Sequence, residues 1–225
     1  MTTKPNPVIT LDGPSGAGKG TIAHAVACDL GFHILDSGSL YRLTALASQD
    51  DHLDINDHAS IAKTALSLDV RFIPHDCGLD IVLRGKDVTE AIRDEAIGMR
   101  ASKVAAIPSV REALLQRQRD FSEPPGLVAD GRDMGTTVFP DAPLKVFMTA
   151  SAEERAERRY KQLKEKGISA NIAALVADLK ARDEQDANRA VSPLKPAEDA
   201  VLLDTTEMSI QDVTQMVLDL AKQRL

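Results

Sequence analysis

Aromatic side chains are scarce in this sequence: tryptophan is absent, and the aromatic share is only 3%. A core built on large rings is therefore excluded, and aliphatic residues must supply it. They are sufficient for this, because 43% of the 225 residues are apolar. A chain of this length and composition suits one α/β domain with an insertion, or two small lobes.

Cysteine is also rare, since only Cys28 and Cys77 occur and no Cys-x-x-Cys spacing is present. This usage excludes a disulfide scaffold and gives no indication of a zinc site. We expect Cys28 to pack as a small side chain on a helix. Cys77 falls in a turn-like stretch and receives no role.

Long apolar runs and leader-like segments are missing as well. No stretch is long enough to span a bilayer, and no signal-peptide pattern precedes the first expected strand. We therefore expect a soluble, cytoplasmic protein with no membrane partner. The net charge of −7 disfavours a nucleic-acid partner. Arginine is nevertheless frequent in the second half, which fits a small anionic ligand.

A glycine-rich segment near the start of the chain is the strongest signal. It consists of Gly13, Pro14, Ser15, Gly16, Ala17, Gly18, Lys19, Gly20 and Thr21. A β-branched run at residues 8–12 precedes it, and an alanine-rich helical pattern follows it. Glycines let backbone N–H groups approach an anion closely, and the helix N-terminus and a lysine add positive charge. This order predicts a nucleotide phosphate site.

The residue after Lys19 departs from the commonest phosphate-loop pattern, which places a Ser or Thr hydroxyl there for Mg²⁺. Gly20 takes that position here, and Thr21 follows one residue later. This form resembles the nucleoside monophosphate kinases, whereas GTPases and most ATPase motors keep the hydroxyl beside the lysine. No metal ligand is assigned directly; we expect Mg²⁺ to be held mainly by ATP phosphates, with Thr21 as a candidate.

The remaining chain alternates short apolar runs with helical patterns, which predicts a parallel sheet flanked by helices. About five strands are expected, at residues 8–12, 32–36, 127–129, 144–149 and 201–204. Residues 68–73 and 79–85 instead alternate around a turn-rich pentapeptide, which predicts an antiparallel hairpin. We therefore expect an inserted lobe at residues 57–99 and a core formed by residues 1–56 and 100–225.

Six motifs occur in order along the chain. They lie at residues 13–21, 35–42, 101–114, 130–136, 182–183 and 188–190. Together they resemble the bacterial cytidylate kinases over nearly the whole chain. The resemblance implies a P-loop NTPase-type sheet, an inserted nucleoside-monophosphate-binding lobe with the hairpin, and a short mobile lid. It also implies a monomer that uses ATP with Mg²⁺ to convert CMP or dCMP to the diphosphate in pyrimidine nucleotide metabolism.

By this resemblance, residues 13–21 cradle the ATP phosphates and Lys19 reaches the one that is transferred. The implied catalytic residues are Lys19, Arg132 and Arg158. The attacking group is a phosphate oxygen that is already ionised, so no general base is required. What is required is neutralisation of about four to six negative charges by Mg²⁺, Lys and Arg.

Three arginines, Arg155, Arg158 and Arg159, fall in residues 151–168, where the resemblance implies the lid. Arg155 and Arg158 are expected to contact ATP. Because one helix cannot direct three neighbouring side chains the same way, at most two of them should reach phosphate. The alternative for each is a surface ion pair with a glutamate of the same helix.

The resemblance also implies a CMP site. Its members are Ser37, Arg42, Ser102, Arg111, Arg132, Asp133, Arg182, Asp186 and Arg189. Arg42, Arg132 and Arg189 would bind the acceptor phosphate. The pair Arg182 and Asp186, four residues apart, would hold the ribose, or would form a plain helical ion pair.

Three of these residues would read the base. Asp133 would accept a hydrogen bond from the cytosine amine, while Arg111 and Ser102 would donate to the ring nitrogen and carbonyl. Uracil has no such amine and would place an acceptor against Asp133. Ser37 is a candidate contact to the acceptor phosphate or ribose, and helix capping explains it almost as well.

Two alternatives stay open. The chain could be a P-loop kinase with another small acceptor, such as UMP or AMP, which the set of Asp133, Arg111 and Ser102 disfavours. It could instead be a GTPase-like switch or a nucleotide-binding module without transfer. The lack of an Asn-Lys-x-Asp motif and the presence of Gly20 count against the switch.

Overall fold

The computed structural model describes residues 6–75, 78–165 and 167–225, and the chain divides into two compact units. Unit 1 runs to Asp36 and resumes at Arg119, continuing to Leu225, whereas unit 2 comprises Ser37–Gln118. Each unit has its own apolar core.

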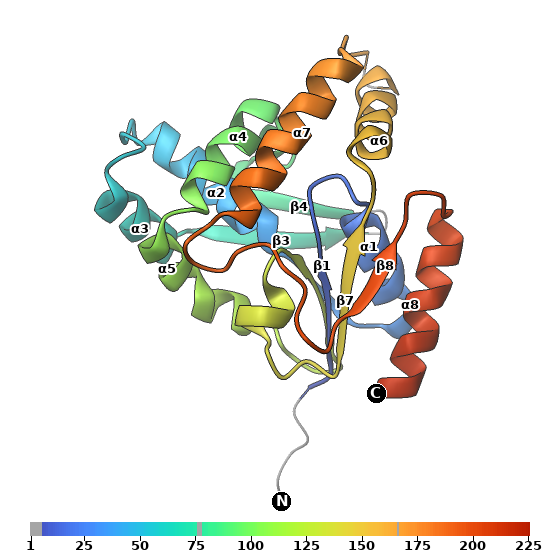
Figure 1. Cartoon of the computed structure of the whole chain (residues 1–225). Helices are drawn as coiled ribbons and strands as arrows, with labels where there is room; N and C mark the ends of the chain where they lie inside the picture. The colour runs from blue at the N-terminus through green and yellow to red at the C-terminus, as the bar shows by residue number, and fades with distance from the viewer. Residues whose placement is uncertain (1–5, 76–77, 166) are drawn as a thin grey trace, which may run out of the picture. The chain divides into compact units, whose positions relative to one another are not determined.

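Unit 1 is built on a five-stranded parallel sheet in the order β2-β6-β1-β7-β8. Figure 1 labels β1, β7 and β8 of this sheet. Its strands are β1 (Val8–Asp12), β2 (His33–Asp36), β6 (Leu127–Gly131), β7 (Leu144–Thr149) and β8 (Val201–Asp204). All five coincide with predicted strands to within two residues. β1 is central and buried throughout, as an unbroken apolar run predicts for a strand covered on both faces.

The strand order reverses at β1. The chain leaves β1 for β2, returns through β6 beside β1, and continues to β7 on the other side of β1. Ligands of open α/β sheets bind beyond the carboxyl ends of the strands at such a point. The register pairs Asp12 with Gly131 and with Phe147. The loops after β1, β6 and β7 therefore leave the same edge of the sheet.

Helices α1 (Lys19–Leu30) and α8 (Ile210–Arg224) pack on the sheet and on each other. Their shared core includes Ile9, Leu11, Ile22, Val26, Val128, Val146, Met148, Val213 and Val217. Helices α6 (Ala152–Glu165) and α7 (Ile172–Ala187) lie side by side as a pair (Figure 1). Glutamate-rich α6 starts where predicted, because the Ser151 hydroxyl accepts from the N–H of Glu154.

The prediction for Cys28 is wrong. Its side chain is exposed, and its Sγ lies 3.7 Å from Nε2 of His24. The reason is helical periodicity: α1 buries Ile22, Ala23 and Val26, and Cys28 falls on the opposite face.

Unit 2 combines helices with a three-stranded antiparallel sheet, β3-β4-β5. Its elements are α2 (Ser37–Asp50), α3 (His58–Leu66), β3 (Val70–His75), β4 (Gly78–Leu83), β5 (Lys86–Asp87), the 3₁₀ turn η1 (Ala91–Arg93), α4 (Glu95–Val104) and α5 (Pro108–Arg119). The predicted hairpin is confirmed and gains β5 as a third strand. Cys77, which lies between the two strands of the hairpin in the sequence, is outside the described residues.

Helix α4 begins at Glu95, because the Asp94 carboxylate accepts from the N–H of Ala96 and caps the helix there. The expected lobe at residues 57–99 lies within unit 2, which extends beyond it at both ends. Its assignment to nucleoside monophosphate binding stays a prediction.

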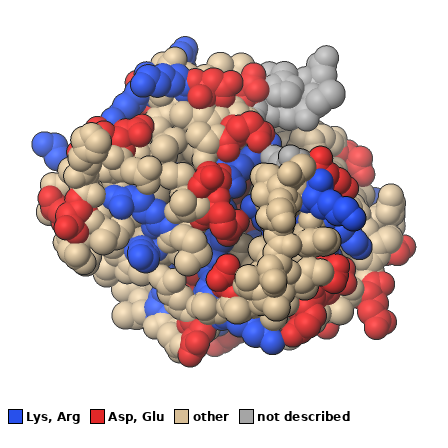
Figure 2. Space-filling model, turned by 90° about the horizontal axis from the view of Figure 1, so that it is seen from above, with Lys and Arg blue, Asp and Glu red and all other residues tan. Residues whose placement is uncertain are grey.

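Charges of both signs are mixed on the surface. Acidic and basic side chains are interspersed over the face drawn in Figure 2. No helix in the described part of the chain is long and apolar enough to cross a bilayer.

Candidate active site

The loop between β1 and α1 has a backbone that requires glycine. Its φ angles are +148° at Gly13, +79° at Gly16 and +89° at Gly18, which other residues rarely adopt. Gly13 also approaches β7 closely, since an added Cβ would lie 2.0 Å from the carbonyl oxygen of Met148. No side chain caps α1 at Gly18, so none competes for its first N–H groups. This is the geometry of an anion cradle.

Replacing Gly13 with alanine is expected to lower the free energy of unfolding by more than about 3 kcal/mol, because left-handed strain and the clash with Met148 add up. Gly31→Ala is the matched control, since its φ of +65° is also left-handed but an added Cβ meets nothing within 4 Å. That variant should lose only about 1–2 kcal/mol. Urea unfolding measures both changes, and equal losses would contradict the close-approach argument.

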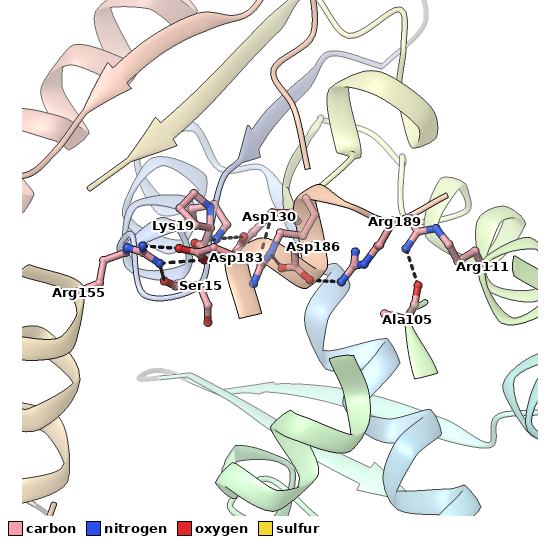
Figure 3. Close-up of polar contacts among 12 residues, drawn as sticks. Ser15, Lys19, Ala105, Arg111, Asp130, Arg155, Asp183, Asp186 and Arg189 are labelled. Carbon is pink, nitrogen blue, oxygen red and sulfur yellow. Dashed lines mark hydrogen bonds and ion pairs between the residues drawn. The ribbon is translucent and has the colours of Figure 1, made fainter. Parts of the chain in front are cut away.

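Lys19 is the first residue of α1, directly after the glycine-rich loop, and is only 5% exposed. Its Nζ donates to the carbonyl oxygen of Pro14 at 2.9 Å and lies 3.7 Å from Oδ1 of Asp130 (Figure 3). Burial lowers the pKa of Lys19 to about 8, and the positive charge of Arg132 acts in the same direction. Burial likewise raises the pKa of Asp130 to about 6, which the charge of Lys19 opposes.

Asp12, at the end of β1, organises the segment after β6. Its Oδ1 accepts from the N–H of Met134 and its Oδ2 from the N–H of Gly135, both at 2.8 Å. These N–H groups begin the π-helical turn η2 (Met134–Val138), which directly follows Arg132 and Asp133. Burial raises the pKa of Asp12 to about 6, although both hydrogen bonds oppose the rise. Asp12 therefore fixes the segment after β6 relative to the phosphate loop.

No role was predicted for Asp12 or Asp130 from the sequence. Their position could have indicated one, because each is an acidic residue near the carboxyl end of an otherwise apolar strand. Asp133 is 2% exposed and precedes η2 as its N-cap residue.

Asp186 on α7 joins two of the arginines predicted for the acceptor phosphate. Its Oδ2 accepts from Nε of Arg132 at 2.9 Å, and its Oδ1 pairs with Nη2 of Arg189 (Figure 3). The Asp186 side chain is only 1% exposed. Unit 1 thus places Arg132 and Arg189 together. Arg182 lies on α7 one turn before Asp186. The predicted ribose contact of Asp186 and Arg182 stays a prediction.

The three arginines of α6 have different partners in the structure, and the prediction that at most two of them reach phosphate stays a prediction. Arg155 is 3% exposed and donates to the carbonyl oxygen of Ser15 at 2.9 Å. Arg158 forms the helical ion pair with Glu154 at 3.0 Å, and its Nη2 donates to the carbonyl oxygen of Thr205 at 2.7 Å. Its Nη1 lies 3.8 Å from the position of a Cβ added at Gly18, beside the phosphate loop. Arg159 contacts Gln162 within α6.

The other predicted CMP-site residues belong to unit 2. Ser37 begins α2, and its hydroxyl donates to Oε1 of Gln118 at 2.7 Å. Arg42 donates from Nη1 to the carbonyl oxygen of Ile92 at 2.7 Å. Ser102 on α4 is buried.

Arg111 on α5 is also buried. Its Nη1 donates to the carbonyl oxygen of Ala105 at 3.2 Å, and its guanidinium lies 5.5 Å from the centre of the Tyr41 ring. This distance is within cation–π range. The predicted CMP-site residues are therefore divided between the two units: of the three predicted to read the base, Asp133 is in unit 1 and Ser102 and Arg111 are in unit 2.

Oxygen ligands for Mg²⁺ are available beside the loop. An added Cβ at Gly20 would lie 3.4 Å from Oδ2 of Asp130, and Thr21 is exposed on the next position of α1. Among the described residues, no group of three or more His, Cys, Asp or Glu side chains could hold a metal ion. Mg²⁺ is commonly held by one or two carboxylates together with substrate phosphates, which fits Asp130.

The chain has extensive similarity to one family. The family model described as "Cytidylate kinase" matches residues 9–223. The chain is 58% identical over 217 residues to a cytidylate kinase of Stutzerimonas stutzeri (strain A1501), covering 96% of this chain and 95% of that protein. It is 55% identical over 219 residues to a cytidylate kinase of Klebsiella pneumoniae (strain 342), covering 97% and 96%.

Similarity to solved structures is weaker. A gluconokinase from Sinorhizobium meliloti 1021 aligns with a TM-score of 0.48 and 15% sequence identity, covering 98% of this chain and 94% of that chain. The family model and the two curated relatives, in contrast, match nearly the full length at high identity. On that evidence, the chain belongs to the cytidylate kinase family.

Proposed function

We propose that the protein transfers the γ-phosphoryl group of ATP to CMP or dCMP, giving ADP and CDP or dCDP. One observation in unit 1 carries this proposal. The glycine-rich loop with Lys19 and the pair of arginines joined by Asp186 occupy the same edge of the sheet, and Arg132 is near enough to lower the pKa of Lys19. Two anion-binding groups at one edge suit a donor and an acceptor phosphate.

The donor side is the loop at residues 13–21. Its N–H groups would surround the ATP phosphates, and Lys19 would neutralise the transferred group. Arg158 lies beside Gly18 and would supply further charge from α6. Mg²⁺ would enter with ATP and neutralise phosphate charge, with Asp130 and Thr21 as the residues that would hold it.

The acceptor side would consist of the residues that the sequence predicted for the CMP phosphate. Arg132 and Arg189 of unit 1 and Arg42 of unit 2 would bind the CMP phosphate, since bidentate guanidinium groups match phosphate oxygens. Because that phosphate is ionised, the residues need only hold and neutralise it.

The base and the sugar would be bound by the residues that the sequence predicted for them. Asp133 would accept from the cytosine amine, while Ser102 and Arg111 would donate to the other edge of the base. The sugar would be held by Arg182 and Asp186. Ser37 would contact the sugar or the phosphate.

An ADP-release assay with CMP, dCMP, UMP and AMP at equal concentration tests this function. CMP and dCMP should give the highest rates. If AMP or UMP exceeds CMP, the chain is a P-loop kinase with a different acceptor. If every acceptor fails while calorimetry still detects ATP binding, the chain is a nucleotide-binding module without transfer. Cytoplasmic location and a monomeric state stay predictions from the sequence.

A further inference from the structure

Helix α7 carries two acidic residues one turn apart, and both hold arginines from other parts of unit 1. Asp186 pairs with Arg132 and Arg189 on the acceptor side. Asp183 pairs with Arg155, which in turn contacts the phosphate loop (Figure 3). Asp183 belongs to the motif at residues 182–183, but no role was predicted for it from the sequence. The proposed chemistry does not use it.

The guanidinium of Arg155 is almost fully occupied by protein acceptors. Its Nε donates to the carbonyl oxygen of Ala150 at 3.0 Å, and its Nη1 donates to the carbonyl oxygen of Ser15 at 2.9 Å. Asp183 accepts from Nη1 at 3.1 Å and from Nη2 at 2.5 Å. A guanidinium has about five N–H groups, so these four bonds leave little capacity for a phosphate.

Arg155 also packs against the loop itself. An added Cβ at Gly16 would lie 3.3 Å from the Cβ of Arg155. The Arg155 side chain is 4% exposed and that of Asp183 is 26% exposed. A bidentate, charge-assisted pair with one partner buried fixes orientation more strongly than an exposed pair does.

We propose that Asp183 is a positioning residue for the donor site: it orients Arg155, which holds the Ser15 carbonyl and thereby the phosphate loop. The proposal rests on the proposed function, since it gives Asp183 a part in ATP binding. Asp183 acts through Arg155 rather than on ATP. Without its carboxylate, the buried Arg155 charge loses its bidentate partner and must reorient, and the loop it contacts moves with it.

A second ion pair between the same helices provides a matched control. Lys180 on α7 pairs with Glu153 on α6 at 2.9 Å, but both side chains are exposed, at 60% and 66%. If the Asp183 pair served only to join α6 to α7, its loss, like the loss of the exposed pair, would change stability and leave ATP binding unchanged. Only the Asp183 pair also contacts the phosphate loop through Arg155.

The test compares Asp183→Asn with Glu153→Gln, using calorimetric binding of ATP, the KM values for ATP and CMP, and Tm. Asp183→Asn should raise the Kd and KM for ATP about tenfold, because the amide cannot make the bidentate, charge-assisted contact that orients Arg155. The KM for CMP should change less than about twofold and Glu153→Gln should leave the Kd for ATP unchanged, because exposed pairs contribute little.

Two results would overturn the proposal. An unchanged Kd for ATP in Asp183→Asn, whatever the loss of Tm, would mean that Asp183 only joins α6 to α7. A lower Kd would mean that Asp183 restrains Arg155 from binding phosphate. If Asp183→Asn does not fold, Arg155→Lys is measured instead. It should also raise the Kd for ATP about tenfold, because an ammonium cannot make the bidentate contact. ATP binding is measured without CMP, so loss of the proposed transfer activity would be recognised separately.

Discussion

Replacing Lys19 with alanine is expected to lower kcat by about 10³-fold, the typical cost of removing a preorganised group that stabilises developing charge. Lys19 is buried, and its ammonium is held by the Pro14 carbonyl beside Asp130. At this buried position, a water molecule that filled the space left by the side chain would not supply the lost positive charge. Steady-state ADP release at saturating ATP and CMP measures the loss, and circular dichroism checks that the variant folds. Near-normal turnover would contradict the proposed donor site.

Lys145 on β7 provides a close control. It is also buried, and its Nζ donates to the carbonyl oxygen of Pro140 at 2.5 Å and to Oδ1 of Asp199 at 2.9 Å. Both lysines therefore lie against a proline carbonyl and an aspartate. Lys145→Ala should lower Tm, while kcat per folded molecule should stay within about twofold of the parent, because its ammonium binds Pro140 and Asp199 rather than the phosphate loop.

The pH dependence of the parent enzyme provides a second check on Lys19. Its pKa is about 8 in the ligand-free protein. The protonated form attracts the triphosphate, so kcat/KM for ATP should fall as pH rises through this value. Lys145→Ala should keep this decline. In Lys19→Ala the remaining activity should lack it, and a persistent decline would assign the titration to another group.

The elements of this fold could be predicted because their signals are local. The strands of the parallel sheet are short apolar runs, and the loop at residues 13–21 combines glycines with a lysine between a strand and a helix. The hairpin of unit 2 was recognisable because its period differs from that of the helices around it.

The polar connections could not be predicted, because they join distant residues. η2 depends on Asp12, which accepts from an N–H 122 positions later in the chain. Asp186 lies close in sequence to Arg189 but far from Arg132, so its bridge depends on the tertiary fold. Arg155 shows the same limit: the family resemblance implied a phosphate contact, whereas the partners of its guanidinium include a backbone carbonyl of the loop.

Removing the carboxylate of Asp133 is expected to reverse much of the preference for cytosine over uracil. Asp133→Ala should lower kcat/KM for CMP on the order of a hundredfold and affect UMP far less, since a well-placed contact to a base edge discriminates by about 1–3 kcal/mol. Asp133 is 2% exposed, so an unmatched acceptor there is costly for uracil in the parent enzyme. ADP-release assays with CMP alone and with UMP alone measure the change.

Asp133→Asn makes the test sharper. The amide has nearly the same shape as the carboxylate, but its NH₂ group can donate to the uracil carbonyl that replaces the cytosine amine. The ratio of UMP to CMP activity should therefore rise further than in Asp133→Ala. The local turn should persist in both variants, because the N–H of Thr137 bonds at 2.9 Å to the backbone carbonyl of Asp133 rather than to its side chain. Equal losses for CMP and UMP would instead assign Asp133 to the structure of η2 and leave the choice of base to Ser102 and Arg111.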